Sequence, residues 1–346
     1  MIILGIETSC DETAISVLDI NGPEDIKIRA NIVSSQIKLH AEFGGVVPNL
    51  AAREHMKNIG HVFETALKEA GISDFKKEID LIAVTHGPGL GPALLVGISF
   101  AKTLAMTHDK PLVGVDHMRG HIYSNWLNED GASKDLPILN LIVSGGHTEL
   151  VLMNDYEGFE VIGETMDDAV GEAFDKVARL LGLGYPGGPE ISRMAENGDA
   201  KRFPLPRPML HSKDFNFSFS GLKTAVLYLT RDLKEKDIEL DEQTKSDIAA
   251  AFQESAIDVL IKKTIQAGKE NGVSGIFLSG GVSANKLLRN ELKKSAEESG
   301  FKFSCPPLIY TGDNASMIAL AGYFMHHKNP TNSNWESVDM QANLSF

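Results

Sequence analysis

Short apolar runs alternate along this chain with longer segments in which apolar residues recur every three or four positions. The first pattern is typical of buried strands and the second of amphipathic helices, so the chain is predicted to be an α/β protein. Strands are expected at residues 2–6, 14–18, 79–85, 112–115, 139–143, 148–153 and 276–278. Helices are expected at residues 50–71, 93–106, 117–126, 163–183, 241–271 and 316–323, and residues 328–346 are expected to form a loose tail.

One strand pattern occurs twice, because residues 2–18 and 139–153 each form an apolar run, a small polar tip and a second apolar run. The first tip, residues 8–13, gathers hydroxyls and carboxylates that suit a phosphate with its counter-ion, although an ordinary polar turn is equally consistent. The second tip holds adjacent glycines at 145 and 146, which let the backbone approach a ligand closely. The shared pattern predicts two lobes built on a similar hairpin.

The length of the chain also favours two lobes, because 346 residues exceed the size at which a single core usually keeps growing. The polar segment 129–136 is the expected boundary. We therefore expect a first lobe of residues 1–131, joined by the C-terminal segment from about 312–346, and a second lobe of residues 132–311.

The composition narrows the possible functions. A net charge of −14 repels a polyanion, so contact with nucleic acid requires a local basic patch or a partner, which disfavours a general DNA-binding protein but not an enzyme acting on RNA. The two cysteines, Cys10 and Cys305, make no disulfide framework. The N-terminus has no basic region ahead of an apolar run, and no apolar stretch has the length of a membrane span. A cytoplasmic protein with no membrane contact is expected.

The most suggestive chemical feature is the pair His117 and His121, four residues apart. On a helix this spacing places both rings on one face, within reach of one metal ion or one anion, but two capping or packing histidines would look the same. A zinc peptidase needs a glutamate directly after the first histidine to activate water, and Met118 occupies that position. A metallo-glycoprotease is therefore disfavoured.

Several glycine-rich and acidic segments are candidate ligand sites. Residues 86–92 form either a tight turn or a phosphate-binding loop. The loop 184–189 follows the acidic residues of segment 163–183 and could bind a ribose. Those acids could instead simply stabilise the start of a helix through its dipole. Asn285, after the paired glycines 280–281, suits a ribose or base edge and equally a helix cap.

Basic and aromatic residues are mixed in segment 198–223. Phenylalanines at 215, 217 and 219 alternate with polar residues, which is compatible with base stacking but also with the buried face of an edge strand. The basic residues that would contact nucleic acid are Lys201, Arg202, Arg207, Lys213 and Lys223.

Seven ordered motifs together resemble one family. They are GIETSCDETA at 5–14, HMRGH at 117–121, LIVSGGHTELV at 141–151, GEAFDKVARLLGLGYPGGP at 171–189, FSFSGLKTA at 217–225, SGGVSANKLLR at 279–289 and TGDNASMIA at 311–319. The chain is similar, from residue 3 to about residue 323, to the bacterial-type tRNA N6-adenosine threonylcarbamoyltransferases, TsaD, once called O-sialoglycoprotein endopeptidases. The resemblance implies a fold of the actin and sugar-kinase (ASKHA) type, with two related α/β lobes around a nucleotide cleft.

The same resemblance implies the site residues. The metal ligands would be His117, His121 and Asp313, and the tentative catalytic acids are Asp11, Glu12 and Glu172. The residues expected to bind the nucleotide substrate are Ile142, Val143, Ser144, Gly145, Gly146, Asp175, Gly188, Ser192 and Asn285.

The reaction implied is transfer of the threonylcarbamoyl group from threonylcarbamoyl-AMP to N6 of the adenosine that follows the anticodon, in tRNAs reading codons that begin with A, with release of AMP. One divalent metal is expected, iron(II) by resemblance, and a site of two histidines and a carboxylate would also accept zinc. Expected partners are tRNA, a shorter TsaB-like paralogue and a small TsaE-like ATPase. The alternative from another class is an actin-like ATP-binding regulatory scaffold, which would explain the glycine motifs but not the set of two histidines and Asp313.

Overall fold

Two mixed five-stranded sheets form the framework of the chain in the computed structural model, which describes residues 1–128 and 135–346. The chain divides into unit 1, Met1–Ala132 with Pro306–Phe346, and unit 2, Ser133–Cys305. The predicted lobes were 1–131 with 312–346, and 132–311. Most of the predicted boundary segment, residues 129–134, lies outside the described residues.

Unit 1 is built on the sheet β3-β2-β1-β4-β5. Its strands are β1 (Ile2–Glu7), β2 (Glu12–Gly22), β3 (Asp25–Ser35), β4 (Leu81–Gly87) and β5 (Leu112–Asp116). Its helices are α1 (Ile37–Ala41), α2 (Pro48–Ala70), α3 (Phe75–Glu78), α4 (Gly91–His108), α5 (His117–Tyr123), η1 (Ser124–Leu127), η3 (Leu308–Tyr310), α11 (Ala315–Lys328) and η4 (Pro330–Asn332).

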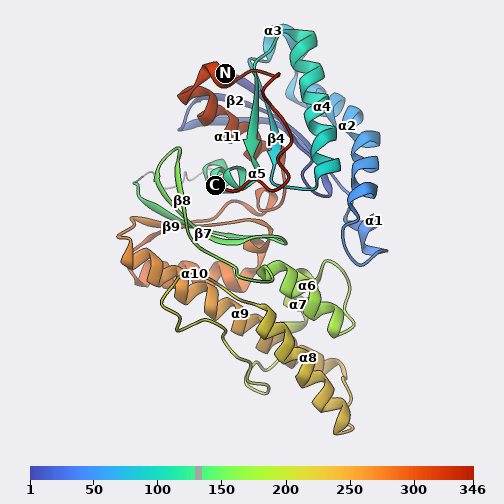
Figure 1. Cartoon of the computed structure of the whole chain (residues 1–346), viewed down its shortest axis with the longest axis vertical. Coiled ribbons are helices and arrows are strands. Elements are labelled where there is room, and N and C mark those ends of the chain that lie inside the picture. The colour runs from blue at the N-terminus through green and yellow to red at the C-terminus, as the bar shows by residue number, and fades with distance from the viewer. Residues whose placement is uncertain (129–134) are drawn as a thin grey trace. The chain divides into compact units, whose positions relative to one another are not determined.

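The two faces of the first sheet are covered by different helices (Figure 1). Leu4 and Ile6 of β1 point toward the apolar core shared with α2 and α4. Gly5, between them, faces α11 instead, and a Cβ there would lie 2.2 Å from the backbone oxygen of Ala315. Alternation of side chains along a strand explains this division, and the absent side chain lets the start of α11 lie directly on β1.

Unit 2 repeats this plan in the sheet β10-β9-β6-β7-β8. Its strands are β6 (Ile138–Val143), β7 (Thr148–Asp155), β8 (Gly158–Glu164), β9 (Gly275–Ser279) and β10 (Lys302–Ser304). Its helices are α6 (Val170–Leu180), α7 (Gly187–Ala195), α8 (Ser220–Glu235), α9 (Glu242–Glu270), η2 (Gly281–Ala284) and α10 (Lys286–Glu298). β6 pairs antiparallel with β7 and parallel with β9, as β1 does with β2 and β4. The predicted α/β class is confirmed.

The helix predicted over 163–183 is wrong at its beginning. Residues 158–164 form β8, and α6 starts only at Val170. Asp167 accounts for the error, because its carboxylate accepts hydrogen bonds from the backbone N–H groups of Phe219 and Ser220, at 2.8 and 3.1 Å. Asp167 was predicted to belong to the helix that became α6, but its carboxylate instead hydrogen-bonds to the start of α8.

The C-terminal residues do not form the loose tail that was predicted. The Gln341 N–H donates to the His86 carbonyl at 2.8 Å, and the Gly89 N–H donates to the Ala342 carbonyl at 3.1 Å. Val338 is buried and belongs to the core of unit 1. Backbone pairing, which polar composition does not reveal, fixes this segment along the loop after β4.

Among the described residues, no helix combines the length and apolar character needed to cross a lipid bilayer.

Candidate functional site

The HMRGH motif forms α5, which begins directly where β5 ends. Asp116, the last residue of β5, caps the helix, because its carboxylate accepts from the N–H groups of Met118 and Arg119 at 2.7 and 3.2 Å. One helical turn places the rings of His117 and His121 with their centroids 4.7 Å apart and nearly perpendicular. Both histidines are buried. The predicted helix and the shared face are confirmed.

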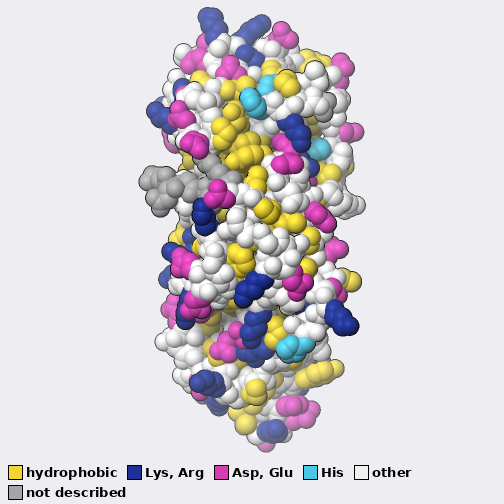
Figure 2. Space-filling view, turned by 90° about the vertical axis from the view of Figure 1, so that its left-hand side faces the viewer, with side chains coloured by type: hydrophobic (Ala, Val, Ile, Leu, Met, Phe, Trp, Pro, Cys, Tyr) yellow, Lys and Arg dark blue, Asp and Glu magenta, His cyan; other side chains and the backbone are white. Residues whose placement is uncertain are grey.

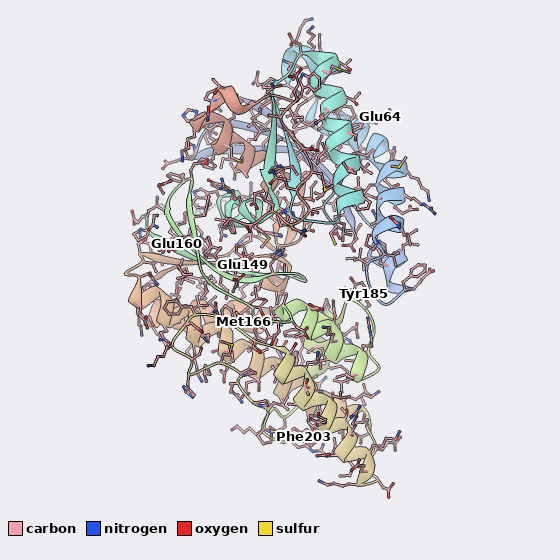
Figure 3. The ribbon with its side chains drawn as sticks, in the orientation of Figure 1. Glu64, Glu149, Glu160, Met166, Tyr185 and Phe203 are labelled. Carbon is pink, nitrogen blue, oxygen red and sulfur yellow. The ribbon has the colours of Figure 1, made fainter. Side chains whose placement is uncertain are left out.

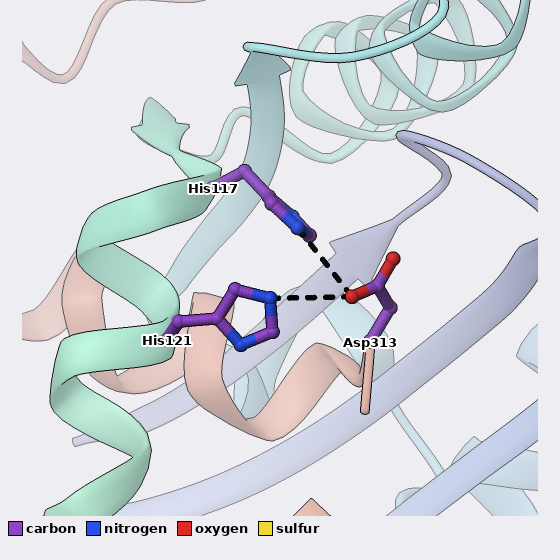
Figure 4. A group of neighbouring side chains, drawn as sticks. All are labelled: His117, His121 and Asp313. Carbon is purple, nitrogen blue, oxygen red and sulfur yellow. Dashed lines mark ion pairs between the residues drawn. The ribbon is translucent and has the colours of Figure 1, made fainter. Parts of the chain in front are cut away.

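Asp313 reaches the two histidines from the start of α11. The next residue, Asn314, caps that helix by accepting from the Met317 N–H at 3.0 Å, and its amide donates to the Gly312 carbonyl at 2.9 Å. Asp313 Oδ1 consequently lies 3.4 Å from His117 Nε2 and 3.3 Å from His121 Nε2 (Figure 4). The structure therefore brings together three residues whose sequence positions span almost two hundred residues.

The three side chains fit a divalent metal. Their ligand atoms all lie within 4.8 Å of one another. The separations of 3.3 and 3.4 Å exceed a good N–H···O hydrogen bond and match two ligand atoms that each lie about 2.0–2.2 Å from one ion. Both ring nitrogens of His121 are buried without a hydrogen-bond partner among the described residues. Two imidazoles and a carboxylate are a donor set that iron(II) and zinc accept.

The electrostatics of the group are dominated by burial and by the carboxylates. Burial would lower the pKa of His117, but Asp313 and Glu7 raise it well above its ordinary value. Burial would raise the pKa of Asp313, and the two histidines more than offset this and hold it below its ordinary value. The two carboxylates thus make this site favourable for a positive charge.

The tip of the first hairpin lies in the same unit. The Asp11 carbonyl accepts from the Gln36 N–H at 2.9 Å, which fixes the tip against the end of β3. Burial, with Asp313 and Asp11 as nearby negative charges, raises the pKa of Glu12 to about 9, and Ser35 donates a hydrogen bond to its carboxyl. Burial and Asp11 also raise the pKa of the Cys10 thiol, so this cysteine is not a thiolate nucleophile at neutral pH.

In unit 2, most of the predicted nucleotide-binding residues are connected through a ring of contacts, which runs from the end of β6 to α6, α7 and the segment after β9. Ser144 follows β6, and its carbonyl accepts from the N–H of Gly171 at the start of α6. Gly280 follows β9 with φ +87°, and a Cβ there would lie 2.3 Å from the Val143 oxygen. Apart from adjacent residues, no atom of the described chain lies within 4 Å of a Cβ built at Gly145, Gly146 or Gly188, so the space beside these glycines is open.

Asp175 and Asn285 close this ring. Asp175 Oδ1 accepts from the Gly187 N–H at the start of α7 at 2.6 Å, beside the loop that carries Tyr185 (Figure 3). Burial raises the pKa of Asp175 although the N–H groups of α7 oppose this. The Asn285 amide nitrogen donates to Ser192 Oγ at 3.0 Å, and its oxygen caps α10 by accepting from the Leu288 N–H at 3.0 Å. The capping alternative for Asn285 is therefore present in the structure.

Glu172 lies on α6 and is about half exposed. Lys176, one turn further along the helix, pairs with it at 2.9 Å and also with Asp168 at 2.7 Å. The ion pair with Lys176 alone explains why an acid occupies position 172. A catalytic role for Glu172 stays a prediction.

Much of the predicted basic patch is engaged in ion pairs within unit 2. Arg202 pairs with Asp247 at 2.7 Å and lies over the ring of Phe203, whose position Figure 3 marks. Arg207 pairs with Glu254 and Asp258 at 3.0 and 2.9 Å, and Lys223 pairs with Asp168 at 3.2 Å. The side chains of Phe217 and Phe219 are fully buried in the core, so they are not stacking platforms for bases.

Two residues beside these groups were not predicted, Glu7 and Gln253. Glu7 is the last residue of β1, and a carboxylate ending a buried strand just before a polar tip was a signal that could have found it. Gln253 accepts from Ser192 Oγ at 2.9 Å and from the Asn285 amide at 2.8 Å. It lies in the middle of α9, where the sequence pattern gives no sign of this contact.

Comparison with known proteins identifies the family. A profile described as "TsaD: tRNA N6-adenosine threonylcarbamoyltransferase" matches residues 27–320. The chain belongs to the TsaD family. A curated relative in Thermosipho africanus, also named tRNA N6-adenosine threonylcarbamoyltransferase, is 52% identical over 328 residues, which are 95% of each chain. The predicted family, enzyme class and function are confirmed by this membership.

Solved structures at low identity share the fold. Full-length HypF, in a phosphate- and nucleotide-bound form, matches with a TM-score of 0.60 and 16% identity over 96% of this chain and 47% of HypF. This TsaD chain thus spans about half the length of HypF. An activator of 2-hydroxyisocaproyl-CoA dehydratase from Clostridium difficile, with bound ADPNP, matches with a TM-score of 0.51 and 13% identity over the whole of both chains. These matches support the predicted ASKHA-type fold.

Proposed function

We propose that this TsaD chain transfers the threonylcarbamoyl group of threonylcarbamoyl-AMP to N6 of the adenosine that follows the anticodon in tRNAs reading codons that begin with A. A bond forms between N6 and the carbamoyl carbon, the bond from that carbon to the phosphate oxygen breaks, AMP leaves, and N6 loses a proton. The observation that carries the proposal is the buried group of His117, His121 and Asp313 in a chain of this family.

His117, His121 and Asp313 would hold one divalent metal, with iron(II) as our first choice and zinc as the second. When bound, such an ion supplies a Lewis acid that withdraws electrons from oxygens of the donor. The chain's own contribution is orientation, because helices α5 and α11 are both capped directly beside the ligands and so hold them in place before substrate arrives.

The nucleotide part of the donor would lie against the ring of contacts in unit 2. Asp175 would accept from ribose hydroxyls, and the open positions at Gly145, Gly146 and Gly188 would let the backbone approach the ligand closely. Ser192 and Asn285 complete this group with further oxygen acceptors.

The remaining task is removal of the N6 proton. Asp11, Glu12 and Glu172 are our candidates. Glu12, with a pKa of about 9 in the metal-free chain, holds a proton at neutral pH and suits donation of a hydrogen bond rather than proton removal. We therefore favour Asp11 as the acceptor of the N6 proton.

Other proteins are expected to assist. We propose a shorter TsaB-like paralogue and a small TsaE-like ATPase as partners, on the family resemblance. We also propose a cytoplasmic location, because tRNA is the expected substrate.

The test is a transfer assay with unmodified tRNA and threonylcarbamoyl-AMP, together with the partners if they are needed. We expect the double variant His117→Ala/His121→Ala to lose both bound metal and transfer. His61→Ala is the matched control, because His61 is an exposed histidine of α2 in the same unit. Transfer by a metal-free double variant at the normal rate would contradict the proposed metal centre, and no transfer by the wild-type assembly would contradict the proposed reaction.

A further inference from the structure

Glu7 is a carboxylate with no exposed surface, at the end of the central strand β1. Taking a carboxylate out of water is costly unless hydrogen bonds compensate it. Three donors from separate parts of unit 1 do so. The Ser9 N–H donates to Oε1, and Thr85 Oγ1, on β4, donates to Oε2 at 2.6 Å. The third donor is His117 Nδ1, 2.9 Å from Oε2.

The contact with His117 determines which ring nitrogen carries a proton. An ionised carboxylate only accepts hydrogen bonds, so Nδ1 must carry the hydrogen that points at Glu7. Ser9 Oγ lies 3.2 Å from the same nitrogen, and with Nδ1 protonated it can share that hydrogen as a second acceptor. The other nitrogen, Nε2, is the one that lies toward Asp313.

We propose that Glu7, held by Thr85, is the positioning residue that fixes the His117 ring with its hydrogen on Nδ1 and presents Nε2 as the metal ligand. The inference rests on the metal centre proposed above. A carboxylate behind a ligating histidine fixes the ring and increases the electron donation of the free nitrogen, and loss of such a partner typically costs about 10–100-fold in metal affinity.

His121 provides an internal contrast. Its Nδ1 is buried with no hydrogen-bond partner among the described residues, so no carboxylate orients this ring from behind. Only one of the two histidines has a supporting acid. Removal of Glu7 should therefore weaken metal binding without abolishing it, whereas removal of either histidine deletes a ligand.

A purely structural role is the competing explanation. Glu7 also connects β1 to β4 through Thr85 and to the hairpin tip through Ser9, so its loss could destabilise unit 1 without any special effect on the metal. The two roles differ in one respect. A structural role predicts lower stability with unchanged metal affinity of the folded protein, and a positioning role predicts lower affinity in protein that remains folded.

The experiment compares Glu7→Gln with the wild-type full chain. Glutamine keeps the size of the side chain but cannot accept from all three donors, because one of its two terminal groups is itself a donor. Zn²⁺ affinity is measured by competition with a chromophoric chelator, and folding by circular dichroism and thermal unfolding. We expect a 10–100-fold weaker affinity. Asp19→Asn is the matched control, because it removes one negative charge from unit 1 at a residue that pairs only with Arg29 among the ion pairs described.

A second measurement does not depend on any variant. In the zinc-loaded wild-type chain with ¹⁵N-labelled histidine, His117 should show a protonated Nδ1 and a metal-bound Nε2. Folded Glu7→Gln with wild-type affinity would overturn the proposal, and so would a metal-bound Nδ1 in the wild type. If the variant does not fold, the nitrogen assignment alone decides.

The results distinguish an error in the metal centre from an error in the role of Glu7. If the wild-type chain binds no Zn²⁺, or if His117→Ala/His121→Ala binds it as tightly as the wild type, the metal centre itself is wrong and the role of Glu7 falls with it. If the histidine variant loses the metal and Glu7→Gln does not, only the role of Glu7 is wrong.

Discussion

At the scale of single residues, His117 is a point where a proton and a metal ion compete. Asp313 and Glu7 raise its pKa well above the ordinary value, against the effect of burial. Below that raised pKa the proton on Nε2 must leave before a metal binds, so metal affinity should fall as pH falls, by about tenfold per pH unit for one proton. Chelator competition between pH 6 and 8 measures this, and an affinity that does not change with pH would contradict it.

Glu12 provides a second pH-dependent test, in the metal-free chain. Its pKa is about 9 in the folded protein against an ordinary value of 4.5. Between these values the folded state holds a proton that the unfolded state has lost, so the free energy of unfolding should decrease as pH rises. In the Glu12→Gln variant the side chain is neutral at every pH, so this decrease in the free energy of unfolding should be absent. The variant should therefore be more stable than the wild type at pH 8.5 but not at pH 4.5. Urea unfolding at both pH values measures the difference, and parallel profiles would show that Glu12 is not held in its protonated form.

The sequence indicates candidate residues for both groups but not the residues that support them. The spacing of His117 and His121 suggests a shared site, the family resemblance adds Asp313, and the structure brings their ligand atoms within 4.8 Å of one another. Glu7 lies within the motif GIETSCDETA, but only its burial and its contact with His117 distinguish it from the neighbouring acids. The spacing of residues along the chain does not reveal contacts between segments that are far apart in the sequence.

At the scale of elements, the C-terminal segment stabilises the loop between β4 and α4. Residues 339, 341 and 342 make three hydrogen bonds with His86 and Gly89, and Leu90 of the same loop donates its N–H to the Ser9 carbonyl at 2.8 Å. Deletion of residues 339–346 should therefore lower the free energy of unfolding by about 1.5–4.5 kcal/mol, at roughly 0.5–1.5 kcal/mol for each lost hydrogen bond.

Chemical denaturation of the deletion variant measures this loss. Gln341→Ala is the control, because the bond from residue 341 is made by its backbone N–H and the side chain is exposed. The control should resemble the wild type. A deletion variant as stable as the wild type would show that the segment contributes no net stability.

The long helix α9 was predicted almost to the residue, at 242–270 against the expected 241–271, because its ends carry clear signals: the Asp241 carboxylate caps its start and Gly272 follows its end. The edge strands β3, β8 and β10 were not predicted. An edge strand is paired on one side and partly exposed, so its apolar pattern is weak, and β8 was further obscured by the acids that follow it. β3 and β8 each pair with the strand directly before them in the sequence, so pairing within a hairpin, rather than their own residue pattern, decides them.

At the scale of the whole molecule, the duplicated plan explains why the pattern of strand, polar tip and strand occurs twice in the sequence. The tip between β1 and β2 corresponds in topology to the tip between β6 and β7, and in each sheet the first strand pairs with the fourth in parallel. The hairpin repeat in the sequence predicted the duplication. The strand order could not be predicted from it, because the parallel pairs join segments separated by long crossovers.

The distribution of charge also belongs to this scale. Acidic and basic side chains are interspersed on the face shown in Figure 2 and do not form one continuous basic field. With a net charge of −14, this chain alone should bind tRNA weakly and with strong dependence on salt. Contact with tRNA must rely on the basic residues that are not already neutralised by neighbouring acids.

Lys201 and Lys213 are the residues of the predicted patch that meet this condition. Both are exposed, and neither makes an ion pair with any residue that the structure describes, unlike Arg202, Arg207 and Lys223. The double variant Lys201→Glu/Lys213→Glu should weaken tRNA binding and reduce the slope of log affinity against log salt by about 1.5–2 if each lysine neutralises one phosphate. Fluorescence anisotropy over a range of salt concentrations measures both effects. Lys293→Glu/Lys294→Glu on α10 makes the same change of charge at exposed residues outside the patch, and equal weakening by both variants would show that net charge, rather than this loop, governs the contact.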